Sequence, residues 1–263
     1  MIPRCELGCF TRPWNQCAFG DFLAGTKAAG YTLAGFMHQQ GTAVLDVDSP
    51  PGRAGEVRAQ VEAAGLAPST LLAGMLLGQP LDEAAAHFRH VIDLAAEAGC
   101  RFVLTCGTDN EDHRQSYIDI IRATADYASE RGVMPTLKPH GGISATSREL
   151  AAMHDEIGHP NFGIYYDPGN VHYYTGESAA EDVKLLGNRA VAMCIKDNTG
   201  GRHGDVAIEP GTGEVDFDAV FGTLFANGFS GPCLVECLGG TTVAEINESA
   251  RRTFDLLARY VAE

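Results

Sequence analysis

Basic residues are scarce in this 263-residue chain, and their scarcity excludes whole classes of partner. The chain has 19 Lys and Arg against 34 Asp and Glu, which gives a formal net charge of −15. A field of that sign repels nucleic acid and anionic membranes unless a local basic patch offsets it. No run of basic residues is longer than Arg251-Arg252. We therefore expect a protein that binds neither nucleic acid nor a membrane.

Long apolar runs are absent as well. No stretch approaches the roughly 18 apolar residues that a membrane-spanning helix needs. The first residues, MIPRCELGCFTRPWNQ, lack the charged segment followed by an apolar segment that marks a secretory leader. From these two absences we expect a cytoplasmic protein.

The eight cysteines lack the close pairing of a zinc ribbon. They are scattered at positions 5, 9, 17, 100, 106, 194, 233 and 237, with no CxxC pair. A chain of this length with 45% hydrophobic residues can build a large core and needs no disulfides for stability. We expect reduced thiols, most of them buried.

A regular alternation of short apolar runs with stretches of helical period is what the sequence does contain. This alternation is typical of βαβ units around a parallel sheet. Helices are predicted at 20–30, 52–66, 81–99, 114–132, 147–158, 177–187, 215–228 and 243–263. Strands are predicted at 4–10, 31–37, 67–74, 102–108, 133–142, 162–170, 190–198 and 232–240.

Eight strand–helix units fit a (β/α)8 barrel, a fold of about 250 residues. We predict one such barrel over residues 1–263, because no long linker or low-complexity segment marks a second domain. The alternative is a doubly wound sheet. That fold would be expected to carry a Gly-rich phosphate fingerprint at its first strand–helix turn, and GCFTRPWN is not one.

Ionisable side chains end four consecutive late strands. Alternate residues of a strand share a face, and barrel active sites lie at the carboxyl ends of the strands, where the loops converge. The side chains expected to face the mouth of the barrel are Lys138 with His140, Asp167, Cys194 with Lys196, and Glu236. A salt bridge at the barrel rim is the alternative for either lysine alone. Buried carboxylates are costly unless a cation or metal compensates them, so Asp167 and Glu236 indicate a function.

Four segments carry a resemblance to a known family: YDPGNVHYYTG (166–176), CIKDN (194–198), PGTGEVDF (210–217) and GFSGPCLVE (228–236). From about Pro80 to its end the chain resembles the xylose isomerase-like barrels. These include sugar-phosphate isomerases, ketose 3-epimerases, inosose dehydratases and endonuclease IV. Together the segments are fairly specific to the superfamily and weakly specific to any one activity.

The resemblance implies that Asp167 and Glu236 bind a divalent metal, with oxygen donors that suit Mn²⁺ or Mg²⁺. His140 would be a further ligand. Two departures alter the usual set. Many relatives have a metal-binding Glu in E-N-H-G-G where this chain has Lys138, and a metal-binding His in H-x-K-D where it has Cys194. A thiolate in the set would favour Zn²⁺.

Three interpretations of this site stay open. In the first, His140, Asp167 and Glu236 hold a metal, with Cys194 as a fourth ligand. In the second, the Lys138 ammonium takes the role of the cation and the site is free of metal. In the third, the site is degenerate and binds without turnover.

The resemblance implies a sugar isomerase or epimerase that removes a proton next to a carbonyl, a reaction that needs a base and an electrophile. We expect Glu236 to be the base and Lys138 the electrophile or conjugate acid. A Schiff base on either lysine is another route, although the two carboxylates argue against it. The residues expected to contact the small carbohydrate-like substrate are His172, Lys196, Arg202 and Asn170, with His38 and Glu6 as weaker candidates.

Two other functions are considered. A dehydratase or lyase acting on a keto-sugar or inosose is the nearest alternative, and a non-catalytic carbohydrate-binding barrel, as an enzyme subunit, is the second. DNA repair is disfavoured, because the sequence has neither a His-rich trinuclear metal site nor phosphate contacts. The one protein assembly that we consider is a homo-oligomer.

Overall fold

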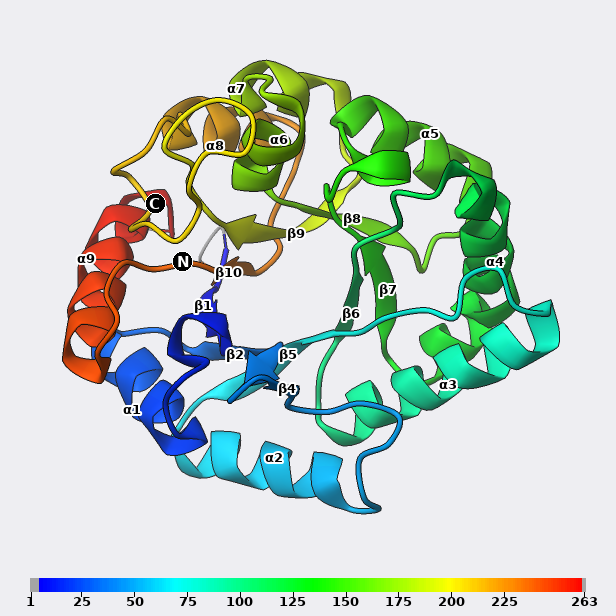
Figure 1. Cartoon of the computed structure of the whole chain (residues 1–263), viewed down its shortest axis with the longest axis horizontal. Helices are drawn as coiled ribbons and strands as arrows, with labels where there is room; N and C mark the ends of the chain where they lie inside the picture. Colours follow the sequence, from blue (N-terminus) through cyan, green and yellow to red (C-terminus); the bar gives the residue numbers. More distant parts are fainter. Residues whose placement is uncertain (1–4, 262–263) are drawn as a thin grey trace.

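A closed barrel of parallel strands forms the centre of the molecule, as predicted (Figure 1). The computed structural model describes residues 5–261. β1 pairs with β2 on one side and with β10 on the other, which closes the sheet. Its eight strands, in the order in which they pair around the barrel, are β1 (Leu7–Phe10), β10 (Cys233–Val235), β9 (Ala190–Ile195), β8 (Gly163–Tyr166), β7 (Met134–Leu137), β6 (Phe102–Thr105), β5 (Ala67–Leu72) and β2 (Leu33–Phe36).

Helices form an outer ring around these strands (Figure 1). Their positions confirm the predicted alternation, with one helix added after β8. The helices are α1 (Phe19–Ala29), α2 (Arg53–Ala63), α3 (Leu81–Glu97), α4 (Arg114–Glu130), α5 (Ser147–Ile157), α6 (Pro168–Thr175), α7 (Ala179–Asp182), α8 (Phe217–Ala226) and α9 (Val243–Val261). A small hairpin of β3 (His38–Gln39) and β4 (Thr42–Ala43) follows β2. The chain is thus a (β/α)8 TIM barrel.

Capping chemistry sets the ends of the helices. In α5, the Thr146 hydroxyl accepts a hydrogen bond from the Arg148 backbone, and the Glu149 carboxylate accepts one from the Thr146 backbone. The same helix ends at Gly158, whose φ of 65° is the left-handed conformation that glycine adopts at least cost. Local sequence therefore specifies where this helix begins and ends.

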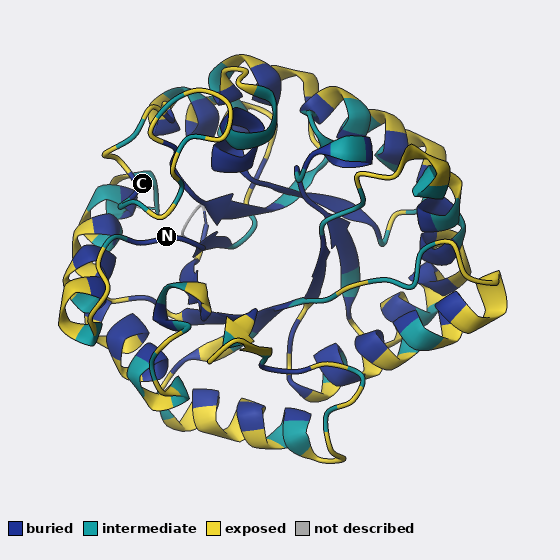
Figure 2. Ribbon diagram, viewed as in Figure 1, coloured by how far each residue is buried: buried dark blue, intermediate teal, exposed yellow. Residues whose placement is uncertain are grey.

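The alternation of side chains along the strands divides the core into a part between the sheet and the helices and a part inside the barrel. This division confirms which strand residues were predicted to face the barrel interior. Buried residues occupy both faces of the strands (Figure 2). Met193, Ile195 and Val235 belong to the core between the sheet and the helices. The barrel interior is filled by Phe10, Leu33, Met37, Phe102, Leu104, Tyr165, Ala192, Cys194 and Leu234. The polar side chains at the ends of β7 to β10 continue this interior face.

The last helix closes the ring by packing on the first. The rings of Tyr31 and Phe254 meet edge to face at 5.1 Å. The Tyr31 hydroxyl donates to the Ala250 carbonyl at 3.1 Å, and Trp14 Nε1 donates to Asn247 Oδ1 at 2.9 Å. Since Trp14 lies in the loop after β1, this packing fixes the loop at the mouth of the barrel.

The hydropathy of the helices and the burial of the cysteines bear on the expected class of protein. No helix of residues 5–261 combines the length and the hydropathy needed to cross a bilayer. Six of the cysteines are buried, as expected. All eight lie within the described residues as free thiols.

Candidate active site

A cavity of about 470 Å³ opens at the carboxyl ends of the strands. Its position is the one at which TIM barrels carry their active sites. Its polar wall is formed by Arg12, Asn15, His38, Lys138, His140, Asn170, Tyr173, Tyr174, Lys196 and Glu236. The structure therefore brings together most of the side chains that the sequence placed at the strand ends.

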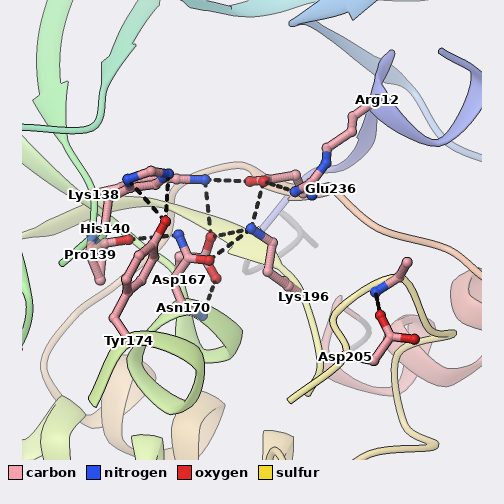
Figure 3. A network of polar contacts seen from close by, with 11 residues as sticks. Arg12, Lys138, Pro139, His140, Asp167, Asn170, Tyr174, Lys196, Asp205 and Glu236 are labelled. Carbon is pink, nitrogen blue, oxygen red and sulfur yellow. Dashed lines mark hydrogen bonds and ion pairs between the residues drawn. The ribbon is translucent and has the colours of Figure 1, made fainter. Parts of the chain in front are cut away.

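Glu236, which follows β10, is surrounded by three cationic side chains (Figure 3). Its Oε1 accepts from Lys196 Nζ at 2.6 Å and from Arg12 Nη1 at 2.7 Å. Its Oε2 accepts from Lys138 Nζ at 2.6 Å. Burial alone would raise the pKa of Glu236, but the charges of Lys138, Lys196 and Arg12 hold it well below its usual value. The carboxylate is therefore ionised at neutral pH.

Asp167 is the second carboxylate and lies deeper. It follows β8 and caps α6, with Oδ1 accepting from the Asn170 backbone at 2.9 Å. Its Oδ2 lies 3.1 Å from Lys138 Nζ and 3.2 Å from Lys196 Nζ. No hydrogen bond to a described residue satisfies this oxygen, so the two ion pairs compensate it. The side chain is fully buried, and it is not among the described residues that line the cavity.

Lys138 and Lys196 are buried but face the cavity. Burial disfavours the charged form of each, yet the nearby Glu236 and Asp167 carboxylates raise the pKa of both lysines, that of Lys138 far above its usual value. Both are therefore ammonium groups at neutral pH, which argues against a Schiff base. Lys196 also donates to Asn170 Oδ1 at 2.9 Å.

His140 and Tyr174 form the other side of the cavity. The Tyr174 hydroxyl lies 3.0 Å from His140 Nε2. Burial and the charges of Lys138 and Lys196 lower the pKa of His140 below its usual value, so its imidazole is neutral at neutral pH. A neutral ring can accept a proton and, once protonated, deliver it to another group.

The expected metal ligands are brought together only in part. Among the described residues, one group of potential ligands has all its donor atoms within 4.8 Å of one another, and it consists of Asp167, Cys194 and Glu236. His140 is outside this group. Burial raises the pKa of Cys194 far above its usual value, so Cys194 is a thiol in the metal-free site.

A divalent ion does not fit this group as the side chains lie. The oxygens that it would need already contact two ammonium groups at 2.6–3.2 Å. Arg12 adds a third positive charge on Glu236. Three cationic side chains therefore face two carboxylates, and a further double charge would meet net repulsion.

Two residues expected to contact substrate lie elsewhere. His172 is a buried residue of α6, and its Nε2 accepts from the backbone of Ala179, at the start of α7, at 3.2 Å. Arg202 is exposed on the loop after β9. Neither is among the described residues that line the cavity, whereas Lys196 and Asn170 are. Of the weaker candidates, His38 lines the cavity and Glu6 lines a depression at the other end of the barrel.

Sequence reasoning missed Arg12 and Tyr174. Arg12 begins a short 3-10 turn (Arg12–Trp14) just after β1. Its signal was its place two residues beyond the end of a strand, where loop side chains turn toward the barrel mouth. Tyr174 lies on α6, the helix that was not predicted, and so it had no expected position.

Comparisons with known proteins agree with this fold. The model of the xylose isomerase-like TIM barrel family matches residues 23–260. The L-ribulose-5-phosphate 3-epimerase UlaE of Salmonella paratyphi C (strain RKS4594) is 28% identical over 171 residues, which are 62% of this chain and 59% of that protein. The chain thus spans less than two thirds of this relative's length.

Two solved structures superpose on almost the whole chain. D-Psicose 3-epimerase with D-tagatose from Clostridium cellulolyticum H10 has a TM-score of 0.76 at 14% identity and covers 98% of this chain and 99% of its own. An IOLI protein with a bound zinc atom has a TM-score of 0.77 at 18% identity and covers 98% of this chain and 100% of its own. Identities this low show a shared fold alone.

Proposed function

Because this chain belongs to the xylose isomerase-like TIM barrel family, we propose that it is a sugar isomerase of the epimerase type. It removes a proton next to the carbonyl of a small carbohydrate. One observation carries the proposal: a carboxylate and two ammonium groups converge on the cavity at the strand ends, each ammonium nitrogen 2.6 Å from a carboxylate oxygen. The names of the relatives, which are ketose and ketose-phosphate 3-epimerases, support this reaction class.

Glu236 is the proposed base. It is ionised and lines the cavity, so it can accept the proton. Its three cationic partners weaken it as a base. The same cations lie where negative charge develops on the neighbouring substrate oxygen, and this stabilises the enediolate that the proton transfer creates. Lys138 is the proposed electrophile, with Lys196 and Asn170 as further substrate contacts.

Epimerisation also needs a proton on the opposite face of the same carbon. His140 is the proposed second group, because it lines the same cavity and its lowered pKa makes its imidazolium, formed when the ring takes up a proton from solvent, a ready proton donor. The Tyr174 hydroxyl orients the ring through the contact with Nε2 at 3.0 Å. Two proton-transfer groups in one cavity suit inversion of configuration.

A divalent ion (Mn²⁺, Mg²⁺ or Zn²⁺) is the other proposal for the electrophile. The bound zinc atom of the IOLI protein supports it, as does the grouping of Asp167, Cys194 and Glu236. The two ammonium groups on those carboxylates oppose it.

A cytoplasmic location is also proposed, and the free thiols support it.

Isotope exchange tests the reaction. The chain is incubated in D2O with L-ribulose 5-phosphate, D-psicose, D-tagatose or D-fructose and followed by proton NMR. We expect deuterium at the carbon next to the carbonyl, together with formation of the epimer, for at least one of these ketoses. Loss of a hydroxyl group as water would instead indicate a lyase. Binding of a ketose by calorimetry, without exchange, would indicate a carbohydrate-binding barrel.

The position of His172 gives a prediction that separates a structural role from a substrate contact. Since its Nε2 accepts a backbone hydrogen bond, His172→Ala is expected to lower the free energy of unfolding by about 1 kcal/mol and to leave KM within about twofold. Urea unfolding and steady-state kinetics measure both. His90→Ala, at an exposed position on α3, is the control and should change neither. A tenfold or larger rise in KM would restore His172 as a substrate contact.

A further inference from the structure

We propose that Lys138 and Lys196 replace a divalent metal in this barrel, so that a pair of ammonium groups is the electrophile that the substrate meets. The proposal rests on the proposed function only for the identity of the reaction in which the two ammonium groups take part. It makes a separate claim about the site itself: Asp167 and Glu236 are the counter-charges of two lysines and hold no metal.

Each ammonium group bridges both carboxylates. Lys138 Nζ lies 3.1 Å from Asp167 Oδ2 and 2.6 Å from Glu236 Oε2. Lys196 Nζ lies 3.2 Å from Asp167 Oδ2 and 2.6 Å from Glu236 Oε1. A metal bound to the same oxygens, at about 2.0–2.6 Å, would lie against both nitrogens. The lysines therefore occupy the space between the carboxylates (Figure 3).

The positions of the side chains relative to the cavity also favour the lysines over a metal. Both lysines line the cavity, whereas Asp167 and Cys194 are completely buried beneath it. A metal held by Asp167, Cys194 and Glu236 would lie under the ammonium groups. A Lewis acid must contact the substrate oxygen that it polarises. The ammonium groups hold the position from which that contact is made.

The charges of the site are already compensated without an ion. Lys138, Lys196 and Arg12 face Glu236 and Asp167, which leaves one positive charge in excess in a chain whose formal net charge is −15. A divalent ion would raise that excess to three in a buried site, where repulsion is screened least. The single excess charge suits the single negative charge of an enediolate.

The two lysines contribute unequally. An ammonium group has three N–H donors. Lys196 Nζ donates to Asn170 Oδ1 and Glu236 Oε1, and Lys138 Nζ donates to Glu236 Oε2. Asp167 Oδ2 contacts both as ion pairs, without a hydrogen bond from a described residue. Lys138 thus keeps two N–H donors for a substrate oxygen and Lys196 keeps one, so Lys138 is the main donor of the pair.

Metal binding by the protein alone tests the proposal. The purified chain is loaded with Mn²⁺, Mg²⁺ or Zn²⁺, dialysed, and analysed by calorimetry and elemental analysis. We expect less than about a tenth of an equivalent of each metal and no change in thermal unfolding with EDTA. About one equivalent of retained metal, or a lowered melting temperature after chelation, would overturn the proposal. Neither measurement needs a substrate. The proposal that the lysines replace a metal can therefore fail while the proposed function stands, and the proposed function can fail while this proposal stands.

Variants extend the test to the lysines. Lys138→Glu exchanges the cation for a carboxylate and is expected to gain at least tenfold in metal affinity over the wild type. Lys138→Met is expected to lower kcat by about 100-fold or more. Lys184→Met, which removes an exposed lysine paired with Glu181, should leave the metal affinity and kcat unchanged. A Lys138→Met variant that folds and retains full kcat would contradict the assignment of Lys138 as the electrophile, whatever the metal content.

Discussion

Glu236→Gln is expected to lower kcat/KM by roughly 10²–10⁴-fold, the usual effect of removing a general base. Gln has nearly the same shape as Glu but cannot take up the proton. Glu236 is also the residue that Lys138, Lys196 and Arg12 all contact, so its substitution disturbs the electrophile together with the base. The measurement is steady-state kinetics with a ketose that exchanges deuterium, at a pH where the wild type is fully active.

Stability is expected to fall in the same variant. Breaking a buried ion pair by removing one partner costs roughly 3–5 kcal/mol, because the other charge is left uncompensated. Here Asp167 still faces both lysines, so we expect a loss of about 3 kcal/mol in urea unfolding. Glu62→Gln is a matched control: it removes an exposed partner of Arg58 and should cost no more than about 1 kcal/mol. A stable Glu236→Gln variant with normal turnover would exclude Glu236 from both roles.

The barrel was predictable because its signals are local and repeated. Buried parallel strands alternate with amphipathic helices, and each helix carries its own caps, so every unit could be recognised independently. Strand period then placed Lys138, Asp167, Lys196 and Glu236 on the inner face, where the structure has them. These side chains extend the inner faces of β7 to β10, and strands are the elements whose side-chain directions follow from sequence alone.

The parts that escaped prediction lie in loops. Arg12 reaches Glu236 from a 3-10 turn, and Arg202 points to solvent from the long segment after β9. No strand or helix period determines the direction of either side chain. The helix α6 does have a signal, since Asp167 is an N-cap and Pro168 occupies the first helical position, but the Gly and Asn that follow are residues typical of a turn. The contact of Tyr174 with His140 depends on that helix.

Asp197→Ala is expected to cause the largest loss of stability, roughly 3–5 kcal/mol, because it leaves several backbone donors without a partner. Asp197 is fully buried after β9, on the strand face opposite to Lys196. Its Oδ1 accepts from the backbones of Asn198 at 2.8 Å and Val215 at 3.0 Å. Its Oδ2 accepts from Gly211 and Gly213, both at 2.8 Å. One carboxylate thus ties the loop that contains the PGTGEVDF segment to the end of the barrel.

The loop packs closely against Asp197 at Gly213. A Cβ atom at Gly213 would lie 2.4 Å from Asp197 Oδ1 and 2.3 Å from the Asn198 carbonyl, so the backbone there can approach only as glycine. Val206, in the same loop, lines the cavity. Loss of the carboxylate should therefore raise KM as well as lower stability. In thermal unfolding, a loss of this size corresponds to a decrease of about 10 °C in melting temperature.

Two further variants separate the causes. Asp205→Ala removes an exposed carboxylate from the same loop, one that accepts from the Ala207 backbone at 2.8 Å, and should change stability by less than about 1 kcal/mol. Asp197→Asn keeps one oxygen and so retains two of the four acceptor contacts, while its NH2 group faces backbone donors. It should fall between the wild type and Asp197→Ala. If Asp197→Ala costs less than about 1 kcal/mol, water satisfies the freed N–H groups and the loop is held by other contacts.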